Sequence, residues 1–363
     1  MTTPESNLAR PGNNDEFIAG FGDTVLVTGA NGFIGSRVVR TLLREGFERV
    51  RCFTRPASGS HLVEAMAGEF GASRVEIVRG NLLSRTDCRD AAAGVSIVYH
   101  LAAGTDKTFP GCVLNSVVTT RNLLDAVVLG KELKRFVNVS SLSVYSNANM
   151  KRGALMDETC ELDRQCAERH DPYAYAKLGQ DDLVLEYART AGLPYVIVRP
   201  GVTFGPGKAT IPGRIGNGTF GVFLHLGLSN RMPLTYVENC AEAIVLAGLR
   251  KGIEGQVINI VDDDLPRSRE FLRLYKQQVR KFASIPVPYP AFSLFSRMWE
   301  RYSQWSGGQL PPVFNPRACA VYYKGNEYSN QKAKDQLGWR PKVAMSDALQ
   351  RYFLHARDAA GAR

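Results

Sequence analysis

The side chains best suited to proton transfer are Tyr173 and Lys177, which stand four residues apart in the run YAYAK. On a helix, residues at i and i+4 share a face, so we expect Lys177 beside Tyr173. A cationic neighbour lowers the pKa of a phenol from about 10 toward neutrality, and the phenol can then exchange a proton with a carbonyl or hydroxyl oxygen. Because Y-x-x-x-K is common by chance, the prediction also depends on what surrounds the pair.

A hydroxyl partner is predicted at the end of an apolar strand over 135–140. Three serines, Ser140, Ser141 and Ser143, lie at this end. Ligands of parallel α/β sheets bind at the carboxyl edge of the strands. A serine at this edge would hydrogen-bond the reacting oxygen, while one or two of the three would serve only as loop or cap residues.

A glycine-rich turn is predicted between the strand over 24–28 and the helix over 33–44. The run TGANGFIG fits G-x-x-G-x-x-G, with Gly29, Gly32 and Gly35 at the glycine positions. Gly29 allows a tight turn, Gly32 admits a pyrophosphate close to the backbone, and Gly35 lets the helix pack on the strand. Free N–H groups at the helix N-terminus favour an anion. The alternative is a plain strand-to-helix turn without a ligand.

The residue that distinguishes the two nicotinamide cofactors is expected at the end of the second strand. An NAD site carries an acid there for the ribose hydroxyls, whereas an NADP site carries a basic residue for the 2′-phosphate. The predicted strand over 50–54 is followed by Arg55, and no acid is present. Because a guanidinium binds phosphate through two hydrogen bonds, NADP(H) is favoured and NAD(H) stays an alternative. Arg55 could also be a solvated loop residue.

Strands alternate with helices around these candidate residues. Short apolar runs predict strands at 24–28, 50–54, 74–78, 96–100, 135–140, 194–200 and 256–261. Helical patterns predict helices at 33–44, 60–69, 84–92, 112–130, 173–190, 239–250, 329–337 and 345–358. This order indicates an α/β fold of the Rossmann type, a doubly wound parallel sheet with helices on both faces.

A smaller C-terminal lobe is expected beside this sheet. Residues 201–233 are Gly-rich and irregular, and residues 284–315 are rich in aromatic residues and proline. We therefore divide the chain into a flexible leader (1–21), a dinucleotide-binding domain (22–200, with 236–262 returning to it) and a substrate lobe (201–235 and 263–363).

Composition excludes several classes of protein. The net charge is +10, but no run of five basic residues and no nucleic-acid motif is present, so no nucleic-acid partner is expected. The seven cysteines are scattered and the five histidines do not cluster, which indicates a reduced cytoplasmic protein without a metal site. No apolar run reaches the ~18 residues of a membrane span, so no integral membrane segment is expected.

Together these motifs resemble the extended short-chain dehydrogenase/reductase family over roughly residues 22–360. The resemblance rests on TGANGFIGS (28–36), HLAA (100–103), RFVNVSSLSVYS (135–146), PYAYAK (172–177), VRPGVTFGPG (198–207) and YVENCAEA (236–243). It implies that Ser141, Tyr173 and Lys177 are catalytic. It also implies a homodimer formed by the helices at 112–130 and 173–190.

The resemblance further implies which residues bind the cofactor. Beyond Gly29, Gly32, Gly35 and Arg55, the expected set is Asn31, Phe33, Ile34, Asn81, Leu82, Leu101, Ala102, Ala103, Tyr173, Lys177, Pro200, Gly201 and Val202. Family members usually end the third strand with G-D-[LV], and Gly80-Asn81-Leu82 keeps a polar side chain there without its charge.

Departures from the family pattern favour one of its branches. Dehydratases carry an Asp-Glu pair where this chain has Leu142 and Ser143, and sugar-nucleotide enzymes usually carry Asn where it has Gly201. The RPGVTFGPG and YSNQKAKDQLGWRPKV runs are more similar to the steroid and flavonoid reductases. The aromatic stretch at 284–315 suits a lipophilic pocket, although a lobe core or a dimer contact would explain it equally well.

The sequence thus predicts an NADP(H)-dependent oxidoreductase. Its small-molecule substrate would be a ketone or secondary alcohol on a bulky, sterol-like or otherwise hydrophobic molecule. Two alternatives stay open. One is a nucleotide-sugar 4-epimerase that retains its NAD(P), and the other is a non-catalytic NADP-sensing or scaffold protein, which would commonly lack the Tyr-Lys pair.

Overall fold

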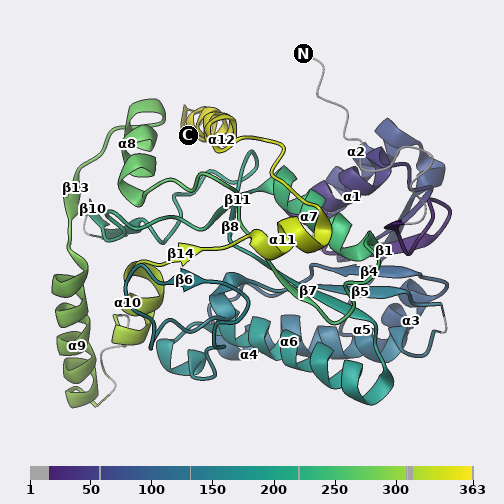
Figure 1. The fold of residues 1–363 in the computed structure, drawn as a ribbon, viewed down its shortest axis with the longest axis horizontal. Coiled ribbons are helices and arrows are strands. Elements are labelled where there is room, and N and C mark those ends of the chain that lie inside the picture. Colours follow the sequence, from purple (N-terminus) through teal and green to yellow (C-terminus); the bar gives the residue numbers. More distant parts are fainter. Residues whose placement is uncertain are drawn as a thin grey trace.

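A parallel sheet of seven strands forms the core of the computed structural model, in the order β12-β7-β5-β4-β1-β2-β3 (Figure 1). The structure describes residues 16–56, 59–130, 132–219, 221–307, 309 and 314–361, so the leader expected at 1–21 lies mostly outside the described residues. The strands of this sheet are β1 (Thr24–Thr28), β2 (Arg49–Thr54), β3 (Val75–Arg79), β4 (Ile97–His100), β5 (Arg135–Val139), β7 (Tyr195–Pro200) and β12 (Val257–Ile260).

Helices cover both faces of the sheet, as the sequence predicts. They are α1 (Gly35–Arg44), α2 (His61–Phe70), α3 (Arg85–Ala92), α4 (Phe109–Cys112), α5 (Thr119–Val127), α6 (Pro172–Ala191), α7 (Val237–Leu249) and α11 (Gln331–Leu337). One face packs against α1, α2, α7 and the region around Trp339, and the other against α3, α5 and α6 (Figure 1). Because both faces are covered, β4 and β5 are buried at every residue, and their apolar residues do not alternate regularly with polar ones.

The predicted fold class is confirmed, and two helices differ in detail. The helix expected from Phe33 begins at Gly35, because Phe33 and Ile34 belong to the preceding turn. The helix expected over 112–130 is divided into α4, a π-helix at Val113–Val118 and α5. Val117 of the π-helix lies against Gly179 of α6, where an added Cβ would be 2.9 Å from the nearest valine methyl carbon.

The remaining elements surround a second core. They are β6 (Leu155–Met156), β8 (Val202–Phe204), β9 (Gly216–Thr219), β10 (Val222–His225), β11 (Leu234–Tyr236), β13 (Ser284–Pro286), β14 (Glu327–Tyr328), α8 (Ser268–Gln278), α9 (Tyr289–Trp305), α10 (Pro316–Tyr323) and α12 (Met345–Gly361). The segment 201–233, expected to be irregular, thus holds three short strands, and most of 284–315 forms β13 and α9. These strands have only three or four residues each, too few for an alternating pattern.

Pairing between β8 and β11 fixes where the lobe meets the sheet. The two strands form a parallel pair in which Val202 faces Leu234, directly after the end of β7. Asp262, at the end of β12, accepts hydrogen bonds from Thr235, Tyr236 and Asn239. The division into a dinucleotide-binding domain and a substrate lobe stays a prediction. Within the described ranges, every helix is too short or too polar to cross a bilayer.

Candidate active site

Two cavities open at the carboxyl edge of the sheet and share Gly29, Gly32, Leu101 and Ala103. The larger has a volume of about 480 Å³ and the smaller about 270 Å³. The predicted residues that line the larger cavity are Gly29, Gly32, Phe33, Ile34, Gly35, Leu101, Ala103, Ser141, Tyr173, Lys177, Pro200, Gly201 and Val202. Those that line the smaller are Gly29, Asn31, Gly32, Arg55, Asn81, Leu82, Leu101, Ala102 and Ala103. The structure therefore brings every predicted site residue to this edge.

The glycine-rich turn requires glycine at its first and last positions. Gly29 has φ of +68°, which a residue with a Cβ rarely adopts. At Gly35 an added Cβ would lie 2.1 Å from the Gly29 carbonyl oxygen. The first turn of α1 has no side-chain cap and no acidic residue, so its N–H groups and dipole favour an anion at the cavity.

Three residues around the smaller cavity come from different strand ends. Arg55 is exposed just after β2, where the cofactor-selecting residue is expected. The side chain of Asn31 accepts a hydrogen bond from the Leu62 N–H (2.9 Å) and so also caps the first turn of α2. The side chain of Asn81 accepts from the Leu83 N–H (3.0 Å), which stabilises its own loop.

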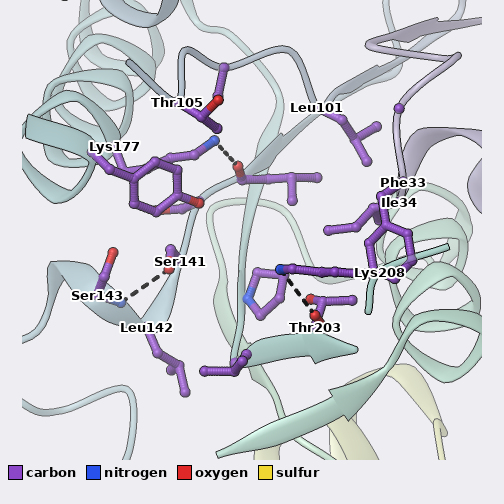
Figure 2. Close-up of a pocket in the computed structure, with 18 of the residues that line it drawn as sticks. Phe33, Ile34, Leu101, Thr105, Ser141, Leu142, Ser143, Lys177, Thr203 and Lys208 are labelled. Carbon is purple, nitrogen blue, oxygen red and sulfur yellow. Dashed lines mark hydrogen bonds between the residues drawn. The ribbon is translucent and has the colours of Figure 1, made fainter. Parts of the chain in front are cut away.

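Helix α6 positions the Tyr-Lys pair. Asp171 caps its N-terminus by accepting a hydrogen bond from the Ala174 N–H (3.0 Å), and Pro172 occupies the first turn. Tyr173 and Lys177 then follow one turn apart. The Lys177 ammonium is buried, lies 6.0 Å from the centre of the Tyr173 ring and donates a hydrogen bond to the Val139 carbonyl oxygen (2.7 Å; Figure 2).

Tyr173 and Ser141 line the same cavity, and the Ser141 hydroxyl acts on the Tyr173 hydroxyl by lowering its pKa. Ser141 also accepts a hydrogen bond from the Ser143 N–H (3.2 Å; Figure 2). Burial raises the pKa of Tyr173 to about 12, although the Ser141 hydroxyl acts in the opposite direction. This pKa differs from the predicted shift toward neutrality, because burial of the phenol outweighs the effect of the Ser141 hydroxyl.

Burial lowers the pKa of Lys177 to about 8, although Asp181 favours its charged form. Asp181 lies one turn further along α6 and is fully buried. Its carboxylate accepts hydrogen bonds from Asn138 (2.8 Å), Ser140 (2.9 Å) and Arg199 (3.0 Å). The sequence analysis missed Asp181, although its i+4 spacing from Lys177 was a usable signal.

His100, in the HLAA motif, is buried beneath the cavities. Its ring nitrogens lie 2.8 Å from the hydroxyls of Thr28 and Thr120. Burial, together with the nearby Lys177 charge, lowers the pKa of His100 to about 3, so the imidazole is neutral. The neutral ring therefore ties β4 to the end of β1 and to α5.

Elements outside the seven-stranded sheet contribute further residues to the larger cavity, which the sequence did not predict. Among them are Thr203, Lys208, Arg214 and Tyr322. The Tyr322 hydroxyl donates to Asp171 (3.0 Å), and the Arg214 guanidinium lies 5.4 Å from the centre of the Tyr322 ring. Tyr322 follows the catalytic motifs by well over a hundred residues, so no local pattern connects it to them.

Two other basic residues of this region lie outside both cavities and are engaged elsewhere. Arg317 forms an ion pair with Glu168 at 3.0 Å, and the Lys324 ammonium donates to the carbonyl oxygens of Asn147 and Ala148. Within the described part of the chain, His, Cys, Asp and Glu side chains form no group that could hold a metal ion.

The edge as a whole fits a dinucleotide. Gly29 and Gly35 keep side chains out of the turn, and the smaller cavity extends along the ends of β2 and β3. Within the described residues, the N–H groups of Phe33, Ile34 and Gly35 have no backbone acceptor. The fold and this edge define the dinucleotide-binding class of α/β proteins. The model of the NAD dependent epimerase/dehydratase family matches residues 25–260, and the chain therefore belongs to this family, whose members are NAD(P)-dependent enzymes.

The relatives of this chain include a reductase and a hydroxysteroid dehydrogenase. The chain is 33% identical over 203 residues to cinnamoyl-CoA reductase 1 of Oryza sativa subsp. japonica, an alignment that covers 55% of this chain and 58% of that protein. It is 28% identical over 349 residues to 3beta-hydroxysteroid-dehydrogenase/decarboxylase isoform 1 of Arabidopsis thaliana, covering 90% of this chain and 78% of that protein.

A solved structure shows the same fold. The structure of UDP-glucuronic acid 4-epimerase from Bacillus cereus in complex with NAD matches 93% of this chain and 99% of its own, with a TM-score of 0.69 and 23% identity. At this level of identity the likeness concerns the fold.

Proposed function

We propose that the protein is an NADP(H)-dependent oxidoreductase that interconverts a ketone and a secondary alcohol on a bulky, sterol-like or otherwise hydrophobic substrate. The observation that carries the proposal is that Ser141, Tyr173 and Lys177 line one cavity with the glycine-rich turn. Bound NADP(H) supplies a hydride donor or acceptor at its nicotinamide ring. The chain's cysteine pattern favours the cytoplasm as its location.

The three side chains divide the work on the substrate oxygen. Tyr173 gives a proton to this oxygen or takes one from it, and Ser141 holds the oxygen in place through a hydrogen bond. Lys177 supplies a buried positive charge beneath the tyrosine ring and would hold the cofactor ribose.

The protonation state of Tyr173 favours the reductive direction. A pKa of about 12, raised by burial, keeps the phenol protonated at neutral pH. A protonated tyrosine can donate to a ketone oxygen as that oxygen gains negative charge. Oxidation of an alcohol would instead require Tyr173 to lose its proton first.

The 4-epimerase alternative is favoured by one observation, the presence of Lys208 and Arg214 in the larger cavity. Cations there would suit the diphosphate of a nucleotide sugar. Binding and turnover separate the two functions. A reductase consumes free NADPH in proportion to product, whereas an epimerase that retains its cofactor shows no net consumption.

A thermal-shift panel gives the first test, because a ligand that binds only the native state raises the apparent melting temperature. The panel contains NADP(H), NAD(H), UDP-sugars and sterol-like ketones. We expect shifts with NADPH and with a hydrophobic ketone added to the NADPH complex. Shifts with UDP-sugars and none with ketones would favour the epimerase.

Replacing Tyr173 with phenylalanine tests the proton donor. We expect Tyr173→Phe to lower turnover by at least ~100-fold while NADPH affinity stays nearly unchanged, because the proton donor is lost and the ring remains. The control is Tyr175→Phe, which alters a partly exposed ring outside both cavities. Activity of Tyr173→Phe close to that of the control would contradict the assigned role.

A further inference from the structure

Lys208 lies on a tight turn that the lobe places over the glycine-rich turn. The turn, Gly205–Lys208, follows β8 directly and is closed by a hydrogen bond from the Lys208 N–H to the Gly205 carbonyl oxygen (3.2 Å). Gly205 has φ of +148° and Gly207 has φ of +105°. A Cβ on Gly205 would lie 2.8 Å from a methyl carbon of Val237, so glycine lets the turn pack against the start of α7.

Two contacts fix this turn against α1 and the residues before it. The Arg37 guanidinium donates a hydrogen bond to the Pro206 carbonyl oxygen (3.3 Å). A Cβ built on Gly207 would touch the Phe33 ring at 3.5 Å. The Lys208 ammonium lies 5.9 Å from the centre of the same ring. The lobe therefore holds a cation beside the residues that follow Gly32.

Lys208 is exposed, and no carboxylate of the described residues balances the charge of its ammonium. Within the described residues its one hydrogen-bond acceptor is the Thr203 carbonyl oxygen at 3.5 Å, and no carboxylate acts on it (Figure 2). Around it, the first turn of α1 has no acidic residue and Arg37 adds a second cation. Lys208 lines the larger cavity, across from Lys177 and Ser141 in the view of Figure 2.

We infer that Lys208 binds a phosphate group held at the glycine-rich turn. A phosphate there would balance the charge of the ammonium and would also accept hydrogen bonds from the N–H groups of Phe33, Ile34 and Gly35, which have no backbone acceptor within the described residues. Because Lys208 lies next to Phe33, the phosphate it binds is expected to be the pyrophosphate of the dinucleotide. The alternative is a phosphate carried by the substrate. The inference rests on the proposed function, in which the dinucleotide binds at this turn. It adds a contact to the dinucleotide from Lys208, which lies in the predicted substrate lobe.

Ligand titrations of the full chain test this contact without any enzyme assay. The probes are ADP-ribose, which carries the pyrophosphate and lacks nicotinamide, together with UDP and inorganic pyrophosphate. The variants are Lys208→Met, which removes the charge, and Lys208→Arg, which keeps it. The control is Lys251→Met, an exposed lysine outside both cavities. Melting temperatures of all variants establish that they are folded.

Lys208→Met is expected to weaken ADP-ribose binding roughly ten- to hundredfold, as the loss of a charged hydrogen bond does. Lys208→Arg and Lys251→Met are expected to stay within about threefold of the wild type, since both keep a cation at position 208. A loss confined to UDP would still support the phosphate contact and would assign it to the substrate.

Unchanged affinity of folded Lys208→Met for all three probes would overturn the inference. Failure of the proposed function looks different. In that case the wild type would bind neither ADP-ribose nor NADPH, yet inorganic pyrophosphate would still bind in a Lys208-dependent manner.

Discussion

Arg55 is the residue at which cofactor choice can be altered. It lies at the end of β2, against the smaller cavity, where an acid would select NAD. We expect Arg55→Asp to weaken NADPH binding by about tenfold or more and to leave NADH binding equal or improved, because a carboxylate repels the 2′-phosphate and accepts from ribose hydroxyls. Kd values for both cofactors, measured by fluorescence titration, provide the check.

The neighbouring strand supplies a control for Arg55. Arg79, at the end of β3, is more than half exposed and pairs with Glu64 at 2.8 Å without lining either cavity. Arg79→Asp is expected to leave the NADPH-to-NADH affinity ratio unchanged. The same unchanged ratio in Arg55→Asp would mean that Arg55 does not contact the cofactor.

His100 is expected to make the folded state sensitive to acid. Burial, with help from Lys177, lowers its pKa from 6.5 to about 3. Between these values the unfolded chain binds a proton that the native chain does not, so the free energy of unfolding decreases as the pH falls from about 6.5. One such group contributes a slope of up to about 1.4 kcal/mol per pH unit.

Urea unfolding at several pH values between 7 and 4 isolates this contribution. We expect His100→Gln, whose amide can still bond the neighbouring threonines, to lose stability less steeply than the wild type as the pH falls. His61→Gln changes an exposed histidine at the start of α2 and is expected to keep the wild-type slope. Parallel curves for wild type and His100→Gln would show that the imidazole does not titrate in this way.

At the scale of elements, α6 combines the catalytic pair with the charge that supports it. The Asp181 carboxylate binds Arg199 of β7 at 3.0 Å, and both side chains are buried. Removing one partner of a buried ion pair leaves the other uncompensated, which costs about 3–5 kcal/mol. We therefore expect Asp181→Asn to lower the free energy of unfolding by this amount in denaturant melts.

A neighbouring acid on the same helix provides the comparison for Asp181. Asp182 is partly exposed and pairs with Arg164 at 2.7 Å. Because exposed ion pairs contribute little, Asp182→Asn is expected to change stability by less than about 1 kcal/mol. Equal effects of the two substitutions would contradict the assigned role of the Asp181–Arg199 pair.

Local spacing was enough to predict which side chains gather at the site. Tyr173 and Lys177 share a helix, and Gly29 to Gly35 share one turn, so their relative positions follow from the chain geometry itself. The tyrosine pKa could not be predicted in this way, because it depends mainly on burial by the folded chain. Tyr322 and Lys208 likewise reach the cavity only through the packing of the lobe.

At the scale of the whole molecule, an exposed apolar surface supports the proposed homodimer. Leu114 and Val118 of the π-helix and Tyr175 and Leu185 of α6 are all more than a third exposed. They lie on the two helical segments from which the dimer was expected, and these segments lie side by side (Figure 1). We expect light scattering to give twice the chain mass, because burying these side chains removes apolar surface from water.

A double variant tests this surface directly. Leu114→Glu with Leu185→Glu is expected to halve the mass, because each charge would have to be buried in the interface. Leu354→Glu places the same charge on α12, where Leu354 is 51% exposed, and is expected to leave the mass unchanged. A wild type with the mass of a monomer would contradict the expected homodimer.

Most of the sheet could be predicted, because its central strands are buried on both faces and therefore have distinct apolar sequences. The lobe could not. β8, β9 and β10 are short, and the Gly-rich sequence between Gly201 and Gly221 predicts only irregular structure. β8 pairs with β11 and β10 pairs with β13, both of which come later in the chain, whereas β9 forms a local antiparallel pair with β10.

The late return of β12 to the sheet has a consequence for synthesis. β7 is complete at Pro200, but its outer neighbour begins only at Val257. At a translation rate of about 5–20 residues per second, the nascent chain therefore exposes an unpaired β7 edge for several seconds. Such an edge is a template for pairing with another chain. Trp339, which completes the apolar layer over α7, follows later still. Ribosomes stalled before Val257 would thus carry chains that depend on chaperones to avoid aggregation.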